Sequence, residues 1–262
     1  MALDLDDLFS VRGKVAVVTG GSRGIGYMIA SGLVANGVRT YITSRRTDAC
    51  DTAAATLSEV GECISIPADL SKAEEIERFA AAVSAREDGI HILVNNAGAA
   101  WGAPLGEFPE MGFDKVMDIN LKAPFMLTQA MLPQLKLAAS FVDPARVIMI
   151  GSIDGIRVPL GDNFSYSASK AGIHMLARHL AHFVAQDRIT VNSIAPGPFE
   201  SKMMSYLLDD PKTREAIEDA NPRGRIGTPE DIVGTVIFLA SRAGAYLTGA
   251  VIPVDGGIST HG

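Results

Sequence analysis

The segment "KVAVVTGGSRGIG" (residues 14–26) joins an apolar run to a glycine-rich turn, and a helical pattern follows over residues 25–36. A glycine at the end of a strand permits a tight turn, and glycines at the start of a helix let a pyrophosphate approach the backbone N–H groups. The spacing Gly20-x-x-x-Gly24-x-Gly26 differs from the G-x-G-x-x-G of many dinucleotide folds, so its position between strand and helix carries the prediction. A purely structural turn is the alternative. The segment predicts a nucleotide phosphate site.

The rest of the chain repeats this alternation of short apolar runs and longer helical patterns. We expect further strands over residues 38–44, 62–68, 91–96, 145–152, 189–195 and 249–255. We expect further helices over residues 49–60, 71–86, 113–137, 166–186 and 229–240, and a Ser-x-x-Glu capping signature at Ser71 marks the start of the second of these. Nearly continuous apolar strands that alternate with helices indicate an α/β fold with a doubly wound parallel sheet. No linker or repeat divides it, so residues 1–262 are expected to form one domain, with ligands at the carboxyl ends of the strands.

Composition and charge exclude several classes of protein. The 262 residues are 47% hydrophobic and 20% charged, which allows a substantial core and disfavours disorder. A net charge of −7 makes a nucleic-acid or anionic-membrane surface unfavourable, although arginines can still form a local phosphate site. Cys50 and Cys63 form no CxxC pair, the N-terminus is acidic, and no apolar run reaches about 18 residues. We therefore expect a cytoplasmic protein.

Eight short motifs occur in a characteristic order along the chain. They are "TGGSRGIG" (19–26), "ADL" (68–70), "NNAG" (95–98), "DINL" (118–121), "GSIDG" (151–155), "YSASK" (166–170), "IAPGPF" (194–199) and "VDGG" (254–257). On these motifs the sequence resembles the short-chain dehydrogenase/reductase family over roughly residues 11–258. The resemblance implies a Rossmann-type fold with a seven-stranded parallel sheet, a nicotinamide dinucleotide and hydride transfer between carbonyl and alcohol.

The resemblance also implies roles for individual residues. Ser152 corresponds to the serine that hydrogen-bonds the substrate carbonyl, and Tyr166 to the proton donor. Lys170 corresponds to the lysine that holds the nicotinamide ribose and acidifies the tyrosine, and Asn120 to the asparagine of a water-linked proton relay. A helix cap or turn is the alternative role for Ser152.

A larger set is expected to contact the dinucleotide. Asp69 would bind adenine in the family, and its alternative role is the cap of the following helix. The full set is Gly20, Ser22, Arg23, Gly24, Ile25, Gly26, Ser44, Arg45, Arg46, Asp69, Leu70, Asn95, Ala97, Gly98, Tyr166, Lys170, Pro196, Gly197, Phe199 and Ser201.

The four-residue spacing between Tyr166 and Lys170 has a physical reading of its own. Residues at i and i+4 share one helix face, so the ammonium can sit beside the phenol. Carbonyl reduction builds negative charge on oxygen, which needs a proton and donors aimed at it. An ammonium about 4 Å from a phenolate lowers the tyrosine pKa by at most about 3 units before desolvation opposes it. The pattern predicts a tyrosine general acid/base.

The end of the second expected strand predicts the cofactor. An NAD-selective site generally has a carboxylate there, which binds the adenosine ribose hydroxyls. Here the strand ends "TSRR", with Ser44, Arg45 and Arg46, and Arg23 lies in the glycine turn. Guanidinium groups bind a 2′-phosphate through charge-assisted contacts, so we expect NADP(H) rather than NAD(H). Solvated turn arginines are the alternative.

The substrate is expected at loops after the fourth and fifth strands and at a lid over residues about 199–225. Apolar side chains there suit an acyl chain, a steroid or a hydrophobic ketone, or pack the lid; they are Trp101, Ile153, Phe199, Met203, Met204, Tyr206 and Leu207. Asp154 and Arg157 lie near the expected mouth, as substrate contacts or as a surface ion pair. His174, His179 and His182 have no further ligand nearby that favours a metal site.

A narrower likeness concerns the substrate. The stretches "WGAPL" (101–105), "DPARVIMIGSIDGI" (143–156), "APGPFESKM" (195–203) and "GAYLTGAVIPVDGG" (244–257) are similar to 3-oxoacyl-thioester (acyl-carrier-protein) reductases of the rhamnolipid-synthesis type. A sugar, steroid or other secondary-alcohol dehydrogenase is the alternative within the class. A non-catalytic dinucleotide-binding sensor or scaffold is the alternative outside it. The family likeness and two long apolar-faced helices also lead us to expect a homotetramer.

Overall fold

Strand β1 (Val15–Thr19) is fully buried at the middle of a parallel sheet. The computed structural model describes residues 4–159, 161–201 and 204–260. Strand β1 pairs with β2 (Arg39–Thr43) on one side and with β4 (Ile92–Asn95) on the other. The sheet order is β3-β2-β1-β4-β5-β6-β7, every pair is parallel, and the remaining strands are β3 (Cys63–Ser65), β5 (Ala145–Ile150), β6 (Ile189–Pro196) and β7 (Val251–Val254). The expected seven-stranded α/β fold is confirmed.

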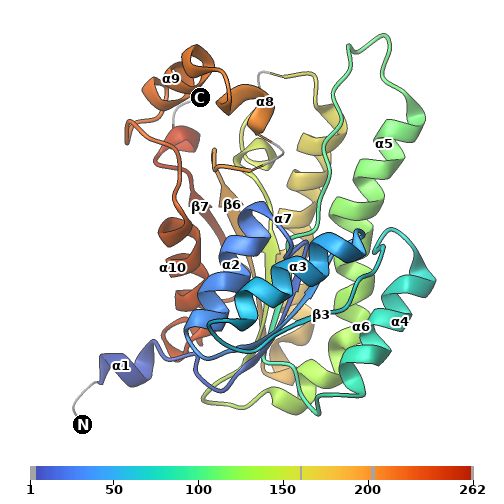
Figure 1. Cartoon of the computed structure of the whole chain (residues 1–262), viewed down its shortest axis with the longest axis vertical. Helices are drawn as coiled ribbons and strands as arrows, with labels where there is room; N and C mark the ends of the chain where they lie inside the picture. Colours follow the sequence, from blue (N-terminus) through green and yellow to red (C-terminus); the bar gives the residue numbers. More distant parts are fainter. Residues whose placement is uncertain (1–3, 160, 202–203, 261–262) are drawn as a thin grey trace.

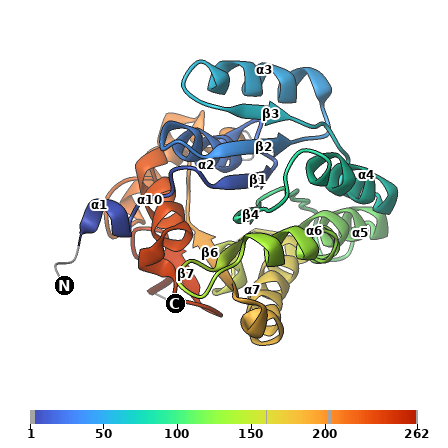
Figure 2. The same ribbon diagram turned by 90° about the horizontal axis from the view of Figure 1, so that it is seen from below.

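Helices cover both faces of this sheet (Figure 1 and Figure 2). On one face lie α2 (Gly24–Ala35), α3 (Thr47–Ser58) and α10 (Pro229–Ala240), whose buried residues form one core cluster with Ile42 and Val94. On the other face α4 (Ala73–Ser84), α6 (Ala123–Ala138) and α7 (Phe164–Val184) build a second cluster around Val17 and Leu93. Strand β1 contributes alternate residues to the two clusters because successive side chains of a strand point to opposite faces.

The helix expected over residues 113–137 is present, but it is not one regular α-helix. The chain instead forms α5 (Glu110–Met117), a π-helical segment (Asp118–Lys122) and then α6. Such single-turn π segments are often found at functional sites. Here the segment buries Asn120, and a continuous α-helix would turn that side chain to another direction.

The expected cap of α4 is wrong. The helix begins at Ala73 after Lys72, which makes no side-chain cap hydrogen bond. Ser71 instead donates its hydroxyl (2.8 Å) and its amide (3.2 Å) to Oδ1 of Asp69. The carboxylate therefore closes a turn ahead of the helix, and Ser71 is drawn into that turn.

Three short helices were not expected: α1 (Leu5–Leu8), α8 (Ser205–Leu208) and α9 (Pro211–Asp219). Helix α9 begins after Asp210, whose carboxylate accepts the backbone N–H of Thr213 at 2.9 Å. The expected lid range thus contains two helices, which follow strand β6 and lie near one end of the molecule (Figure 1). No helix in the described part of the chain is long and apolar enough to cross a membrane.

Candidate active site

A cavity of about 2080 Å³ opens at the carboxyl ends of the strands. Its wall comes from the glycine turn, from the loops after β2, β4, β5 and β6, and from the start of α7 and the lid. Every expected catalytic and cofactor-binding residue lines it except Asn95 and Asn120. Segments that are far apart in the sequence therefore meet in one space, as expected for ligands in a doubly wound fold.

The glycine turn is held by contacts that leave no room for side chains. Gly20 has φ of 67°, and its N–H donates to the Thr43 carbonyl at 2.8 Å. A Cβ on Gly26 would lie 2.3 Å from Nδ2 of Asn96 and from the Gly20 carbonyl oxygen. Arg23 precedes α2 and makes no side-chain cap, and the first residues of the helix, Gly24, Ile25 and Gly26, line the cavity. This is the geometry of an anion-binding helix start.

Asn96 and Thr19 tie this turn to the loop after β4, although the sequence did not single out either residue. Nδ2 of Asn96 donates to the Thr19 carbonyl at 2.8 Å. The Thr19 hydroxyl accepts the backbone N–H groups of Asn96 (2.8 Å) and Ala97 (2.9 Å). Asn96 follows Asn95 in the "NNAG" motif, so the motif marked this loop, although we singled out Asn95 and not Asn96.

The end of β2 supplies a cationic wall. Ser44, Arg45, Arg46 and Arg23 all line the cavity, and the three arginines are exposed. Within the described residues none of these arginines forms an ion pair. Three guanidinium groups without carboxylate partners at one end of a cavity form a site for a strongly anionic group.

Asp69 and the two asparagines have structural contacts of their own. Asp69 lines the cavity, and its carboxylate holds Ser71 in a turn instead of capping α4, the alternative weighed for it. Asn95 lies off the cavity wall, buried, with Nδ2 donating to the Thr128 hydroxyl at 3.2 Å. Asn120 lies behind the wall, where its amide bonds both backbone groups of Ala99 (2.8 and 2.9 Å) and the hydroxyl of Ser169 (3.0 Å). Asn120 thus fastens the loop after β4 to α7.

Ser152 follows β5 and precedes a short 3-10 helix (Ile153–Gly155). Its Oγ accepts the N–H of Asp154 at 3.1 Å, so the serine is indeed a turn cap. Accepting that bond leaves the hydroxyl hydrogen free to donate. The Ser152 side chain also hydrogen-bonds Tyr166 and acts to lower its pKa. The cap and the donor roles are therefore compatible.

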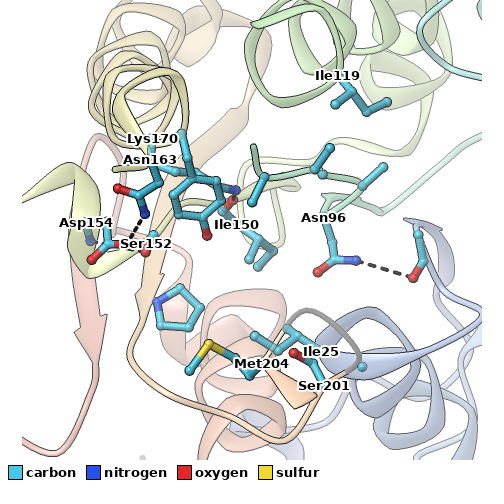
Figure 3. Close-up of a pocket in the computed structure, with 18 of the residues that line it drawn as sticks. Ile25, Asn96, Ile119, Ile150, Ser152, Asp154, Asn163, Lys170, Ser201 and Met204 are labelled. Atoms are coloured by element: carbon cyan, nitrogen blue, oxygen red, sulfur yellow. Dashed lines mark hydrogen bonds between the residues drawn. The ribbon is translucent and has the colours of Figure 1, made fainter. Parts of the chain in front are cut away.

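Tyr166 and Lys170 lie on consecutive turns of α7, with the ammonium nitrogen 5.5 Å from the tyrosine ring centroid. The Lys170 ammonium donates to the Ile150 carbonyl at 2.7 Å (Figure 3). Burial raises the pKa of Tyr166 to about 12 and lowers the pKa of Lys170 to about 8. Desolvation disfavours both charged forms and so opposes the acidification expected from Lys170, which stays a prediction.

The opposite end of the cavity combines apolar and polar groups. Trp101 packs against α5, where a Cβ on Gly112 would lie 2.7 Å from the indole, and Lys115 lies 5.3 Å from the ring centroid. Burial raises the pKa of Asp154, which accepts a hydrogen bond from Asn163 at 3.3 Å (Figure 3). The ion pair weighed for Asp154 with Arg157 does not form in the described structure, although both line the cavity.

The remaining expected substrate residues are partly accounted for. Ile153, Phe199 and Met204 line the cavity, and Phe199 is also packed against Gly227 of the lid base. Met203 and the side chains of Tyr206 and Leu207 lie outside the described residues. Among the residues described, no group of three or more His, Cys, Asp or Glu side chains is placed to hold a metal ion.

The chain is similar in sequence to several known reductases. A family model described as enoyl-(acyl carrier protein) reductase matches residues 20–259. The rhamnolipids biosynthesis 3-oxoacyl-[acyl-carrier-protein] reductase of Pseudomonas aeruginosa is 47% identical over 249 residues, which cover 95% of this chain and 97% of that protein. The short-chain dehydrogenase/reductase PhomF of Diaporthe leptostromiformis is 33% identical, covering 96% and 93%.

A solved structure has the same architecture. The Pseudomonas aeruginosa RhlG/NADP active-site complex superposes with a TM-score of 0.94 at 46% identity and covers 97% of this chain and 99% of that one. Both the family model and these relatives span nearly all of the chain, including every element that lines the cavity. The chain therefore belongs to the short-chain dehydrogenase/reductase family and is an oxidoreductase that interconverts carbonyl and alcohol groups.

Proposed function

We propose that the protein reduces the 3-oxo group of an acyl thioester to a 3-hydroxy group with NADPH. The observation that carries the proposal is one continuous cavity that has Ser152, Tyr166 and Lys170 at its centre and an arginine-lined end. The 47% identical relative is a 3-oxoacyl-[acyl-carrier-protein] reductase, which supports the same substrate class here.

The cavity's residues fit NADP(H). The Gly20–Gly26 cradle, which a Cβ would fill, suits a pyrophosphate at the start of α2. Arg23, Arg45 and Arg46 suit a 2′-phosphate, because they lack carboxylate partners in the described part of the chain. The relative solved with NADP supports this preference.

The chemistry divides between the cofactor and three side chains. Bound NADPH supplies the hydride that goes to C3 of the substrate. The hydroxyl of Ser152 donates a hydrogen bond to the substrate carbonyl oxygen, and Tyr166 gives that oxygen its proton. The Lys170 ammonium lies one helical turn from Tyr166, so its charge stabilises the tyrosinate that proton transfer leaves. The Asn120 side chain fixes the loop after β4 against α7, which carries Tyr166 and Lys170. We also assign to Asn120 the support of a water-linked proton relay, which the family resemblance implies.

The size and lining of the cavity suit an extended substrate. Drug-sized pockets are commonly about 300–1,000 Å³, and this cavity is larger. One wall, from the lid, is apolar and includes Met204, Ala216 and Ile217. The facing wall, from α5, presents Glu110, Asp114 and Lys115. We place the acyl chain along the lid and the polar thioester arm along α5.

The deciding experiment measures NADPH oxidation by the purified protein on a panel of carbonyl compounds. We expect the highest kcat/KM for 3-oxoacyl thioesters on acyl carrier protein or coenzyme A, against diketones, steroids and sugar ketones. Turnover of sugars alone would replace the substrate proposal with a sugar dehydrogenase. Dinucleotide binding without turnover of any compound would favour a sensor or scaffold.

Replacing the proton donor tests the catalytic assignment. Tyr166→Phe removes the phenolic proton and little packing, so kcat falls by at least ~10² while NADPH affinity stays close to that of the wild type. Stopped-flow rates and NADPH fluorescence titration measure the two quantities. Near-normal turnover in this variant would remove Tyr166 from its role.

We also propose that the protein is a cytoplasmic homotetramer. The outer face of α6 and α7 leaves Phe125, Met175 and Phe183 exposed, and a hollow of about 400 Å³ lies between the two helices. Exposed apolar side chains that gather on one face commonly mark a protein–protein interface. Both cysteines are free and buried, which suits a reducing compartment.

A further inference from the structure

His174 extends the row that Tyr166 and Lys170 form along α7. It lies four residues after Lys170, so it occupies the next turn of the same helix face. Only 5% of its surface is exposed, and both ring nitrogens have partners. Nε2 lies 2.9 Å from the Ser152 carbonyl oxygen, and Nδ1 lies 2.8 Å from the hydroxyl of Ser193 on β6. This histidine therefore contacts the backbone of the residue that we assign as substrate hydrogen-bond donor.

The imidazole is fitted against the end of β5. A Cβ on Gly151 would lie 2.0 Å from the ring's Cε1 atom and 2.7 and 2.8 Å from its two nitrogens. Any side chain at position 151 would displace the ring, so Gly151 provides the space that lets His174 reach past the strand end. The Gly151 amide is bound to the Ile194 carbonyl at 2.7 Å, which keeps that space fixed.

The partners determine the protonation of the ring. A carbonyl oxygen only accepts, so Nε2 must carry hydrogen and donate to Ser152. Burial is the largest influence on the pKa of His174 and lowers it, and the neighbouring Lys170 and Arg178 lower it further. The ring is therefore neutral, and Nδ1 accepts the proton of Ser193. The Ser193 hydroxyl has one proton and also lies 3.2 Å from the Met149 carbonyl, so with a neutral ring the proton goes to Nδ1, the nearer acceptor at 2.8 Å, and the network links α7 to β6.

We infer that His174 is a positioning residue of the reaction, which holds the Ser152 backbone so that the serine hydroxyl meets the substrate carbonyl. This inference rests on the proposed function of Ser152. Lys170 donates to the Ile150 carbonyl and His174 to the Ser152 carbonyl, so one face of α7 fastens the strand end on both sides of Gly151. Without the bond from His174, the Ser152 carbonyl keeps only the local bond from the Gly155 N–H at 3.0 Å, which moves with the turn, and the Ser152 hydroxyl is aimed less accurately.

Three substitutions at position 174 separate the contribution of each ring nitrogen. His174→Leu removes both bonds, and we expect kcat to fall about ten- to a hundredfold, the scale of a small misplacement of a reacting group. His174→Gln keeps an N–H at nearly the distance of Nε2 and should recover kcat to within about threefold of the wild type. His174→Asn offers its amide at the Nδ1 distance, can reach Ser193 but not Ser152, and should remain as slow as the leucine variant.

A double mutant tests whether the effect passes through Ser152. If His174 acts by aiming that hydroxyl, His174→Leu should change kcat less than about twofold in a Ser152→Ala background. A histidine that only stabilises α7 would cost the same factor in both backgrounds. Additive losses, or leucine and glutamine variants of equal rate, would overturn the inference.

Two controls keep this result distinct from the proposed function. His182→Leu removes an exposed histidine from the same helix and should leave kcat unchanged, and the Tm of every variant checks folding. NADPH affinity should change less than about threefold in His174→Leu, because Lys170 keeps its own bond. If Ser152→Ala alone retains wild-type kcat, the role proposed for Ser152 fails. If it loses activity while His174→Leu does not, the positioning role alone fails.

Discussion

At the scale of single residues, burial rather than charge attraction sets the acidity of the site. Removing water from Tyr166 disfavours the phenolate and raises its pKa to about 12, and the same loss of water lowers the pKa of Lys170 to about 8. A phenol with a raised pKa keeps its proton at neutral pH. Tyr166 in these surroundings therefore holds the proton that carbonyl reduction consumes, and only a small fraction is deprotonated to act as the base in the reverse reaction.

A substitution of Asp154 tests what sets the pKa of Tyr166. Its carboxylate raises the pKa of Tyr166 by like-charge repulsion, and it lines the cavity. Asp154→Asn removes the repulsion, so the pKa of Tyr166 falls. Alcohol oxidation needs the deprotonated tyrosine, so the rise of oxidation kcat/KM with pH should move to lower pH in this variant. Asp162→Asn, also at the cavity wall, is the control. A midpoint that stays in place or moves upward contradicts the assignment.

Arg45 tests the cofactor preference at the other end of the cavity. Arg45→Ala removes one guanidinium from the arginine-lined end of the cavity. It should lower the kcat/KM for NADPH by a factor that corresponds to about 1.5–3 kcal/mol, the scale of a charged hydrogen bond. NADH lacks the 2′-phosphate, so its kcat/KM should change little. Steady-state kinetics with both cofactors measures the two kcat/KM values. Arg86→Ala, at an arginine just after the end of α4, serves as the control. Equal losses for both cofactors would show that Arg45 supports the fold.

At the scale of elements, periodicity predicted the pieces that bury an apolar face and missed those that do not. Strand β1 was found because it is a continuous apolar run, and helix α10 because it buries apolar residues at a helical period. Helix α9 is polar and buries none of its described side chains, so no period marked it. The π-helical turn between α5 and α6 was missed because it places Asn120 against segments that are distant in the sequence, Ala99 and Ser169.

The site was predictable where it follows contiguous motifs. The glycine turn and "YSASK" both lie on the cavity wall as predicted, because position in a strand–helix unit fixes where those residues point. Thr19, Asn96 and His174 were missed as site residues, since each acts through partners dozens of residues away or on another element. The size of the opposing desolvation could not be predicted for a related reason: the sequence gives the spacing of Tyr166 and Lys170 but not the depth of their burial.

Two glycine substitutions test the turn as an element. In Gly26→Ala the new methyl group would meet the Gly20 carbonyl oxygen at 2.3 Å, so the turn must shift, and we expect a loss of at least about 2 kcal/mol of stability with much weaker NADPH binding. Gly234→Ala is matched to it, because that glycine lies exposed within α10 with open space around its Cβ. It should stabilise the protein by about 0.5–1 kcal/mol. Urea unfolding measures both, and equal stability of the two variants would contradict the close packing.

At the scale of the whole molecule, the catalytic cavity and the exposed apolar face lie on different sides of the same helices. Tyr166, Lys170 and His174 point from α7 towards β5, while Met175 and Phe183 remain exposed on that helix. Helix α7 thus connects the site to the outer face of the α4–α7 layer (Figure 2). An association that covers this face would also fix the helix that carries the catalytic groups.

The tetramer is tested by placing charge on that face. Light scattering of the wild type at micromolar concentration should give about four times the chain mass of 27.6 kDa. Met175→Glu introduces a carboxylate beside the hollow lined by Leu121, Phe125 and Leu176, and an unpaired charge there opposes burial, so the mass should fall to that of a dimer or monomer. Val60→Glu, an exposed apolar position just after α3, should keep the wild-type mass. Because Met175 touches neither the cavity nor its ligands, any loss of kcat in the dissociated variant would measure how far subunit packing holds α7 in place, and a wild type that is monomeric would remove the proposal.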